Sequence, residues 1–194
     1  MKVCGLILAA GGSSRLGRAK QLLQQQGKSL LALSIETALA AGLDPVYVVL
    51  GARQEQILDE ISHLPVKIIS NQEWQEGIGS SIRIGISHIE AEESYDAVVI
   101  LLCDQLLITA DHIKSLVALY QSSHKPIVAT AYGAQSGVPA LFSHSYFHLL
   151  LALQGDTGAR KIIAQHQQNA HVVNFEAAAL DIDTAEDARG AGLS

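Results

Sequence analysis

Short apolar runs alternate along the chain with longer segments whose apolar residues recur every three or four positions. The longer segments predict helices, because that spacing places apolar side chains on one helix face. The alternation of the two patterns is typical of an α/β domain with a mostly parallel sheet. The short runs predict strands over residues 3–8, 46–50, 66–69, 97–102, 127–131, 139–142 and 172–175.

Capping residues mark the ends of the expected helices. Ser29 can cap a helix over residues 30–41, and Gly42 follows that segment where a helix would end. The glutamine-rich stretch at 24–26, followed by a glycine, suggests an exposed loop. Further helices are expected over residues 80–93, after Thr109, over 146–153 and after Thr184.

Length and composition favour one folded domain over residues 1–194, with 48% hydrophobic and 16% charged residues. A net charge of -6 and a pI near 5.7 argue against broad binding to nucleic acid or to a membrane surface, since both need clustered positive charge. Cys4 and Cys103 lie inside apolar runs, which predicts buried thiols and fits the cytoplasm. We expect no membrane span and no signal peptide.

The stretch "LILAAGGSSRLGRAK", residues 6–20, joins a predicted strand to a glycine-rich turn. Glycine allows backbone N–H groups to approach a phosphate closely. Arg15, Arg18 and Lys20 make this stretch locally positive in a negatively charged chain. The combination favours a small anionic ligand over a turn with merely solvated cations.

Two common phosphate-binding motifs do not fit this loop. The dinucleotide fingerprint G-x-G-x-x-G fails because Ser13 stands where its second glycine belongs. Gly12 and Gly17 have the spacing of the P-loop, but Arg18 and Ala19 follow where lysine and a magnesium-binding hydroxyl are required. Both motifs are therefore rejected.

The loop instead resembles the signature loop of nucleotidyltransferases, in which Arg15 and Lys20 would neutralise a nucleoside triphosphate. Such a transfer needs a divalent metal, and Asp104 follows an apolar strand at the sheet edge where α/β folds bind ligands. Asp181 and Asp183 alternate in an extended segment and offer a second carboxylate. Each of these aspartates could equally be a turn or capping residue.

Six short motifs extend the resemblance over nearly the whole chain: "LAAGGSSRLGRAK", "NQEWQEGIGSSIRIG", "CDQ", "GVP", "GDTGAR" and "DIDTAED". In this order and spacing the sequence resembles the molybdenum cofactor cytidylyltransferases, which form molybdopterin dinucleotides. The resemblance implies a single Rossmann-like, three-layer domain of the nucleotide-diphospho-sugar transferase type. It also implies Mg²⁺, and Ala10 in "LAAG", as against "LAGG", implies CTP.

The same resemblance assigns the site residues. Arg15, Lys20 and Asp104 are implied in catalysis. Asp104 and Asp183 are implied as metal ligands, with Asp181 as the alternative to Asp183. A nucleotide site is implied at Leu8, Ala9, Ala10, Gly11, Gly12, Arg15, Lys20, Gly79, Ser80, Ser81 and Asp104, and a substrate site at Asn71, Gly137, Pro139, Asp156 and Arg160. For Asp156 and Arg160, a helix N-terminus with a salt bridge at its C-terminal side is the equal alternative.

Three residues complicate these assignments. Trp74 could flank the pterin or be a packed aromatic. Leu106 and Ala185 replace prolines that the family usually has, and we expect them to alter turn rigidity more than chemistry.

The implied reaction is attack by the terminal phosphate of molybdopterin on the α-phosphorus of CTP, giving molybdopterin cytosine dinucleotide and pyrophosphate. A phosphate nucleophile is already anionic, so positioning and charge stabilisation would supply the rate without a general base. A molybdenum hydroxylase could receive the product. The alternatives are a guanylyltransferase of the same family, a cytidylyltransferase acting on a sugar or alcohol phosphate, and a noncatalytic carrier of molybdenum cofactor.

Overall fold

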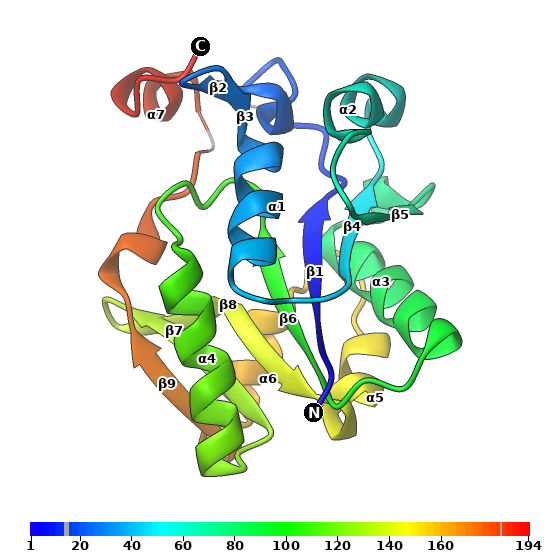
Figure 1. Cartoon of the computed structure of the whole chain (residues 1–194), viewed down its shortest axis with the longest axis vertical. Coiled ribbons are helices and arrows are strands. Elements are labelled where there is room, and N and C mark those ends of the chain that lie inside the picture. Colours follow the sequence, from blue (N-terminus) through cyan, green and yellow to red (C-terminus); the bar gives the residue numbers. More distant parts are fainter. Residues whose placement is uncertain (14–15, 183) are drawn as a thin grey trace.

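A seven-stranded β-sheet forms the centre of the molecule (Figure 1). The computed structural model describes residues 1–13, 16–182 and 184–194. The strands of the sheet are β1 (Val3–Ala9), β4 (Val46–Leu50), β5 (Lys67–Ser70), β6 (Ala97–Leu102), β7 (Ile127–Tyr132), β8 (Gln135–Ser143) and β9 (Ala170–Asn174). Their order across the sheet is β5-β4-β1-β6-β8-β7-β9.

Most strand pairs are parallel, as the sequence predicted. β1 lies between β4 and β6 and pairs with both in parallel, and β8 is antiparallel to both β6 and β7. Leu8 of β1 lies opposite Leu102 of β6, so the carboxyl ends of these two strands meet at one edge of the sheet. Ligands of open α/β sheets bind at this edge.

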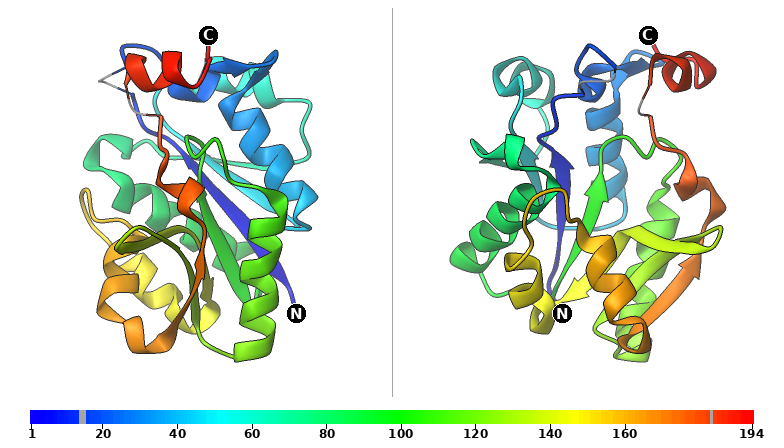
Figure 2. Two further views of the ribbon diagram at one scale, coloured as in Figure 1. Left: turned by 90° about the vertical axis from the view of Figure 1, so that its left-hand side faces the viewer. Right: turned by 180° about the vertical axis from the view of Figure 1, so that it is seen from behind.

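Helices cover both faces of the sheet and complete the three layers expected (Figures 1 and 2). On one face α1 (Leu30–Ala40), α2 (Gln54–Ile61) and α4 (Ala110–Ser123) bury their apolar residues in one core cluster. On the other face α3 (Ile78–Glu92), α5 (Phe147–Leu151) and α6 (Ala159–Gln165) share a second cluster. Gly85 lets α3 approach β1 closely, because a Cβ there would lie 2.8 Å from Leu6.

The predicted caps of three helices are confirmed. Ser29 accepts a hydrogen bond from Ala32 N, and Thr109 accepts one from His112 N. Thr184 caps α7 (Ala185–Gly190) through a reciprocal capping box with Asp187. These side chains satisfy backbone N–H groups that the first helical turn leaves unpaired.

The stretch expected to be an open loop is a short hairpin. β2 (Gln24–Gln25) and β3 (Lys28–Ser29) pair in antiparallel fashion around Gly27, whose φ of +82° suits glycine. The end of the chain joins this hairpin, since Gln24 and Ser194 exchange backbone hydrogen bonds of 2.9 and 3.1 Å.

Short 3-10 helices are η1 (Lys20–Leu22), η2 (Trp74–Glu76), η3 (His144–Tyr146), η4 (Gln167–Asn169) and η5 (Glu176–Ala179). Within the described ranges, no helix combines the length and apolar character that a membrane crossing demands.

Candidate functional site

Lys20 and Asp104 form an ion pair at the meeting point of β1 and β6. The glycine loop leaves β1 after Ala9 and reaches Lys20 at the start of η1, while Asp104 follows closely on the end of β6. Nζ of Lys20 contacts Oδ2 of Asp104, and both side chains are largely buried, at 19% and 9% exposure. The parallel pairing of the two strands therefore brings together two residues that the sequence singled out separately.

The second carboxylate oxygen of Asp104 lacks a hydrogen-bond partner among the described residues. This oxygen, Oδ1, is buried. Buried polar atoms are normally satisfied, so a donor or a cation is the expected partner here. No group of three or more His, Cys, Asp or Glu side chains that could hold a metal occurs in the described ranges, and Arg15 and Asp183 lie outside them.

Gln21 holds the glycine loop through its side-chain amide. Its side chain is 1% exposed, and its amide Nε2 donates to the carbonyls of Ala9, at 2.7 Å, and Gly11, at 2.9 Å. The backbone N–H of Lys20 donates to Oγ of Ser13 at 3.1 Å. Sequence reasoning missed Gln21, because a glutamine beside a lysine gives no signal that it is buried.

A pocket of about 340 Å³ opens beside this ion pair. Its walls come from the end of β1, the glycine loop, η2, the start of α3, the end of β6 and the 154–158 loop, which joins α5 to α6. Sequence reasoning did not single out Gln75, Gly77 or Ile78, which also line it. The expected site residues that line it are Leu8, Ala9, Ala10, Gly11, Gly12, Lys20, Ser81, Asp104 and Asp156.

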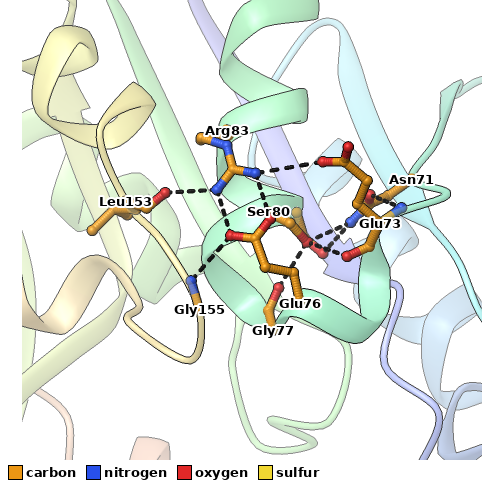
Figure 3. A network of polar contacts seen from close by, with 9 residues as sticks. Asn71, Glu73, Glu76, Gly77, Ser80, Arg83, Leu153 and Gly155 are labelled. Carbon is orange, nitrogen blue, oxygen red and sulfur yellow. Dashed lines mark hydrogen bonds and ion pairs between the residues drawn. The ribbon is translucent and has the colours of Figure 1, made fainter.

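Asn71, Gly79 and Ser80 do not line this pocket and instead hold the start of α3. Asn71 is 2% exposed, and its Nδ2 donates to the hydroxyls of Ser80, at 2.9 Å, and Ser81, at 3.0 Å. The N–H of Gly79 donates to the carbonyl of Gly155 at 2.9 Å. These residues therefore shape the wall to which Ser81 belongs, and Figure 3 shows Asn71 and Ser80 within it.

Gly137, Pro139 and Arg160 also lie away from the pocket, in β8 and α6. A Cβ at Gly137 would lie 2.4 Å from the hydroxyl of Tyr132, so a larger residue there would displace that hydroxyl. Burial raises the pKa of Tyr132, and the charge of Arg160 acts in the opposite direction. Of the residues expected to bind the second substrate, Asp156 lines the pocket, Asn71 holds the start of α3, and Gly137, Pro139 and Arg160 lie in β8 and α6.

Trp74 wedges between two glycines and forms part of the pocket wall. A Cβ at Gly51 would lie 2.6 Å from Cβ of Trp74, and one at Gly12 would lie 3.0 Å from Cζ3 of the indole ring. Trp74 also lines the pocket. Of the two roles that the sequence allowed, packing against the glycine loop is established by these contacts, and the ring is placed where it could also flank a ligand.

Cys103 lines the pocket, and its surroundings favour the protonated thiol. Burial raises the pKa of its thiol to about 12, and the neighbouring charge of Asp104 adds to the effect. The thiolate is the reactive form of cysteine. Lys20 and the carboxylates of Asp104 and Asp156, which line the described part of the pocket, therefore suit charge stabilisation better than covalent catalysis.

Comparison with known proteins shows the family of the chain. The family model described as "MobA-like NTP transferase domain" matches residues 5–170. The purine catabolism protein PucB of Bacillus subtilis is 34% identical over 94% of this chain and 92% of that one. Nicotine blue oxidoreductase of Paenarthrobacter nicotinovorans is 29% identical over 95% and 93%.

Solved structures support the fold over the same length. The crystal structure of the Rv0371c homologue from Mycobacterium sp. strain JC1 has a TM-score of 0.83 and 27% identity, covering 98% of this chain and 96% of that one. The expected fold of the nucleotide-diphospho-sugar transferase type is confirmed. The chain belongs to the family of MobA-like NTP transferases, and its class of activity is nucleotidyl transfer.

Proposed function

We propose that this protein transfers CMP from CTP to the terminal phosphate of molybdopterin, with release of pyrophosphate. The observation that supports it most directly is the Lys20–Asp104 pair beside the glycine loop, on the wall of a pocket of about 340 Å³. A triphosphate needs cations and backbone N–H donors, and a pocket of this size is within the range of small-molecule sites.

Asp104 is suited to hold Mg²⁺. Its buried Oδ1 has no protein partner among the described residues, and Mg²⁺ prefers one or two carboxylate oxygens together with waters and substrate phosphates. Asp183 is proposed as the second carboxylate, with Asp181 as the alternative. When bound, the ion would neutralise charge on the triphosphate and on the departing pyrophosphate.

The residues of the chain would contribute positioning and charge. Gly11 and Gly12 would present backbone N–H groups to the triphosphate, and the ammonium of Lys20 would stabilise the charge that develops on it. Arg15 is proposed to act with Lys20. The attacking phosphate is anionic at neutral pH, so no residue has to remove a proton.

The choice of CTP rests on the resemblance at Ala10. The names of the two relatives refer to purine catabolism and to nicotine blue, and neither specifies a nucleotide. Because Ser13 breaks the dinucleotide fingerprint, we do not extend the oxidoreductase name to this chain. A molybdenum hydroxylase is proposed as the receiver of the product.

Pyrophosphate release tests the proposal. Purified protein is incubated with Mg²⁺, molybdopterin and each of CTP, GTP, ATP and UTP. We expect release with CTP to exceed that with the other nucleotides. Release with GTP above CTP would assign the guanylyl reaction instead, and no release with any nucleotide would leave the carrier role.

A second arm of the same experiment separates the acceptors. Sugar phosphates and alcohol phosphates replace molybdopterin at fixed CTP. Turnover with one of them above that with molybdopterin would assign the protein to the corresponding cytidylyltransferases.

A further inference from the structure

Gly155, in the 154–158 loop, is held through both its backbone groups. Its carbonyl accepts from the N–H of Gly79 at 2.9 Å, and its own N–H donates to Oε1 of Glu76 at 3.1 Å. Gly79 belongs to the first turn of α3, and Glu76 ends η2. The 154–158 loop is therefore attached to the wall that carries Trp74 and Ser81.

Arg83 holds the carboxylate of Glu76 in place for this contact (Figure 3). Its Nη1 and Nη2 donate to Oε1 and Oε2 of Glu76, at 2.8 and 2.7 Å. Nη1 also donates to the carbonyl of Leu153 at 2.8 Å. A bidentate arginine–carboxylate pair fixes the orientation of the carboxylate as well as neutralising its charge, whereas a lysine ammonium does not fix the orientation.

These contacts place Asp156 in the pocket. A Cβ at Gly77, whose φ is +122°, would lie 2.5 Å from Oδ1 of Asp156, so the carboxylate occupies the space that a side chain at position 77 would take. Asp156 lines the same pocket as Lys20 and Asp104. As a carboxylate it can only accept hydrogen bonds, so it suits a substrate edge rich in N–H donors, such as the amino and ring N–H groups of a pterin.

We propose that Glu76 and Arg83 are positioning residues for the second substrate: together they fix the 154–158 loop on α3 so that Asp156 faces the pocket. The identity of the second substrate rests on the proposed function, whereas the attachment of the loop to α3 does not. Neither Glu76 nor Arg83 lines the pocket, so both act through Asp156.

Exposed Glu73 provides a matched control. Its side chain is 75% exposed and lies 3.5 Å from Nη2 of Arg83, but among the described contacts it makes none with the 154–158 loop. Glu73→Gln removes a charge next to Arg83 while leaving the Glu76 contacts in place. Glu76→Ala, Glu76→Gln and Arg83→Lys perturb the attachment itself, and the two conservative variants retain side-chain volume if Glu76→Ala folds poorly.

Two readouts are measured on each variant. The first is hydrogen exchange of the Gly155 amide in the substrate-free protein, and the second is KM for molybdopterin and for CTP. In Glu76→Ala we expect exchange of the Gly155 amide to rise about tenfold and KM for molybdopterin to rise about tenfold, with KM for CTP within about twofold. Arg83→Lys should give smaller changes in the same direction, and Glu73→Gln should give neither.

The double variant Glu76→Ala/Asp156→Asn tests whether the two residues act as one unit. We expect its KM for molybdopterin to be no higher than that of the worse single variant, because coupled residues are not additive. Additive effects, unchanged protection of Gly155 in Glu76→Ala, or equal rises in both KM values would each overturn the inference. If wild-type protein makes no dinucleotide while Glu76→Ala still loses Gly155 protection, the proposed function fails and the attachment of the loop stands.

Discussion

The two oxygens of Asp104 lie in different surroundings. Oδ2 contacts the ammonium of Lys20, while Oδ1 is buried with no partner among the described residues. A charge held this way is oriented before any ligand arrives, which reduces the reorganisation that accompanies transfer. The same geometry means that Lys20 must share its ammonium between Asp104 and the triphosphate.

Replacing Asp104 by Asn tests this arrangement. The amide keeps the shape of the side chain but loses its charge, so we expect kcat for nucleotidyl transfer to fall at least about 100-fold. Asp111→Asn, whose side chain is 93% exposed in α4, is the control and should retain activity. Pyrophosphate release gives the rate, and circular dichroism checks the fold. Turnover close to wild type in Asp104→Asn would remove Asp104 from the catalytic machinery.

The position of Trp74 leaves no room for a side chain at Gly51. We expect Gly51→Ala to lower the free energy of unfolding by about 1–3 kcal/mol, because its Cβ would lie 2.6 Å from Trp74 and 2.9 Å from the carbonyl of Ala10. Gly11→Ala is the matched control for stability, since a Cβ there meets nothing within 4 Å. Urea denaturation measures both. Equal stability of the two variants would show that the loop and Trp74 move apart at little cost.

At the scale of elements, η2, the start of α3 and the 154–158 loop form one connected wall. We expect the stability that this wall contributes to depend on pH. Arg83 and the N–H of Gly155 lower the pKa of Glu76 to about 2 from its ordinary 4.5. A carboxylate whose pKa is depressed by folding stabilises the fold above its ordinary pKa. That contribution is lost as the pH falls towards about 2.

A comparison of wild type with Glu76→Gln follows this contribution. We expect the melting temperature of wild type to exceed that of Glu76→Gln at pH 6, and the difference to shrink as the pH falls from 4.5 towards 2. Scanning calorimetry across that range measures it. A difference that stayed constant down to pH 2 would contradict a charged Glu76 as its source.

The elements that sequence predicted best are the long, periodic ones with caps. α1 and α4 begin at Ser29 and Thr109 as expected, because a capping hydroxyl is a local signal. α2 (Gln54–Ile61) was missed, and a helix start near α6 (Ala159–Gln165) was predicted only as an alternative to substrate binding. Both helices are short, and the residues before them, Arg53 and Gly158, provide no side-chain cap. α2 packs against α1 and η1, and α6 packs against β8 and α5, and a single-sequence pattern does not contain contacts between separate elements.

At the scale of the whole molecule, His112 connects α4 to the sheet and to the segment after β9. Its ring stacks on Phe175 at 4.3 Å, and its Nε2 lies 2.7 Å from Oγ1 of Thr130. Thr130 donates its one hydroxyl proton to the carbonyl of Pro139 at 2.6 Å, so Nε2 of His112 must be the donor. Burial lowers the pKa of His112 below its ordinary 6.5.

Stability should therefore decrease in mild acid. Below pH 6.5 the unfolded chain takes up a proton that the buried imidazole resists, so the free energy of unfolding falls as the pH drops from about 6.5. We expect His112→Gln to flatten this dependence between pH 7 and 5, and His148→Gln, exposed in α5, to leave it unchanged. Urea titrations at each pH measure it. An unaltered slope in His112→Gln would assign the effect to other groups.

The sequence located one side of the site better than the other. The glycine loop and Asp104 are local signals, and parallel pairing of β1 with β6 was enough to bring them together. Gln21 was not predictable because no local signal marks a glutamine as buried, and the attachment of Asp156 was not predictable because it depends on a contact between segments remote in the chain. The motif placed Asn71 and Gly79 near the site, but it did not show whether they line the pocket or hold the residues that line it.

The position of Trp74 also gives the molecule an optical reporter. It is the single tryptophan of the 194 residues, and it lies on the wall of the pocket against the glycine loop. All indole emission therefore originates at the candidate site, and its intensity and wavelength depend on what shares the pocket. Titration of the unlabelled protein with CTP or with molybdopterin, each alone, would follow the occupancy of the pocket without any turnover.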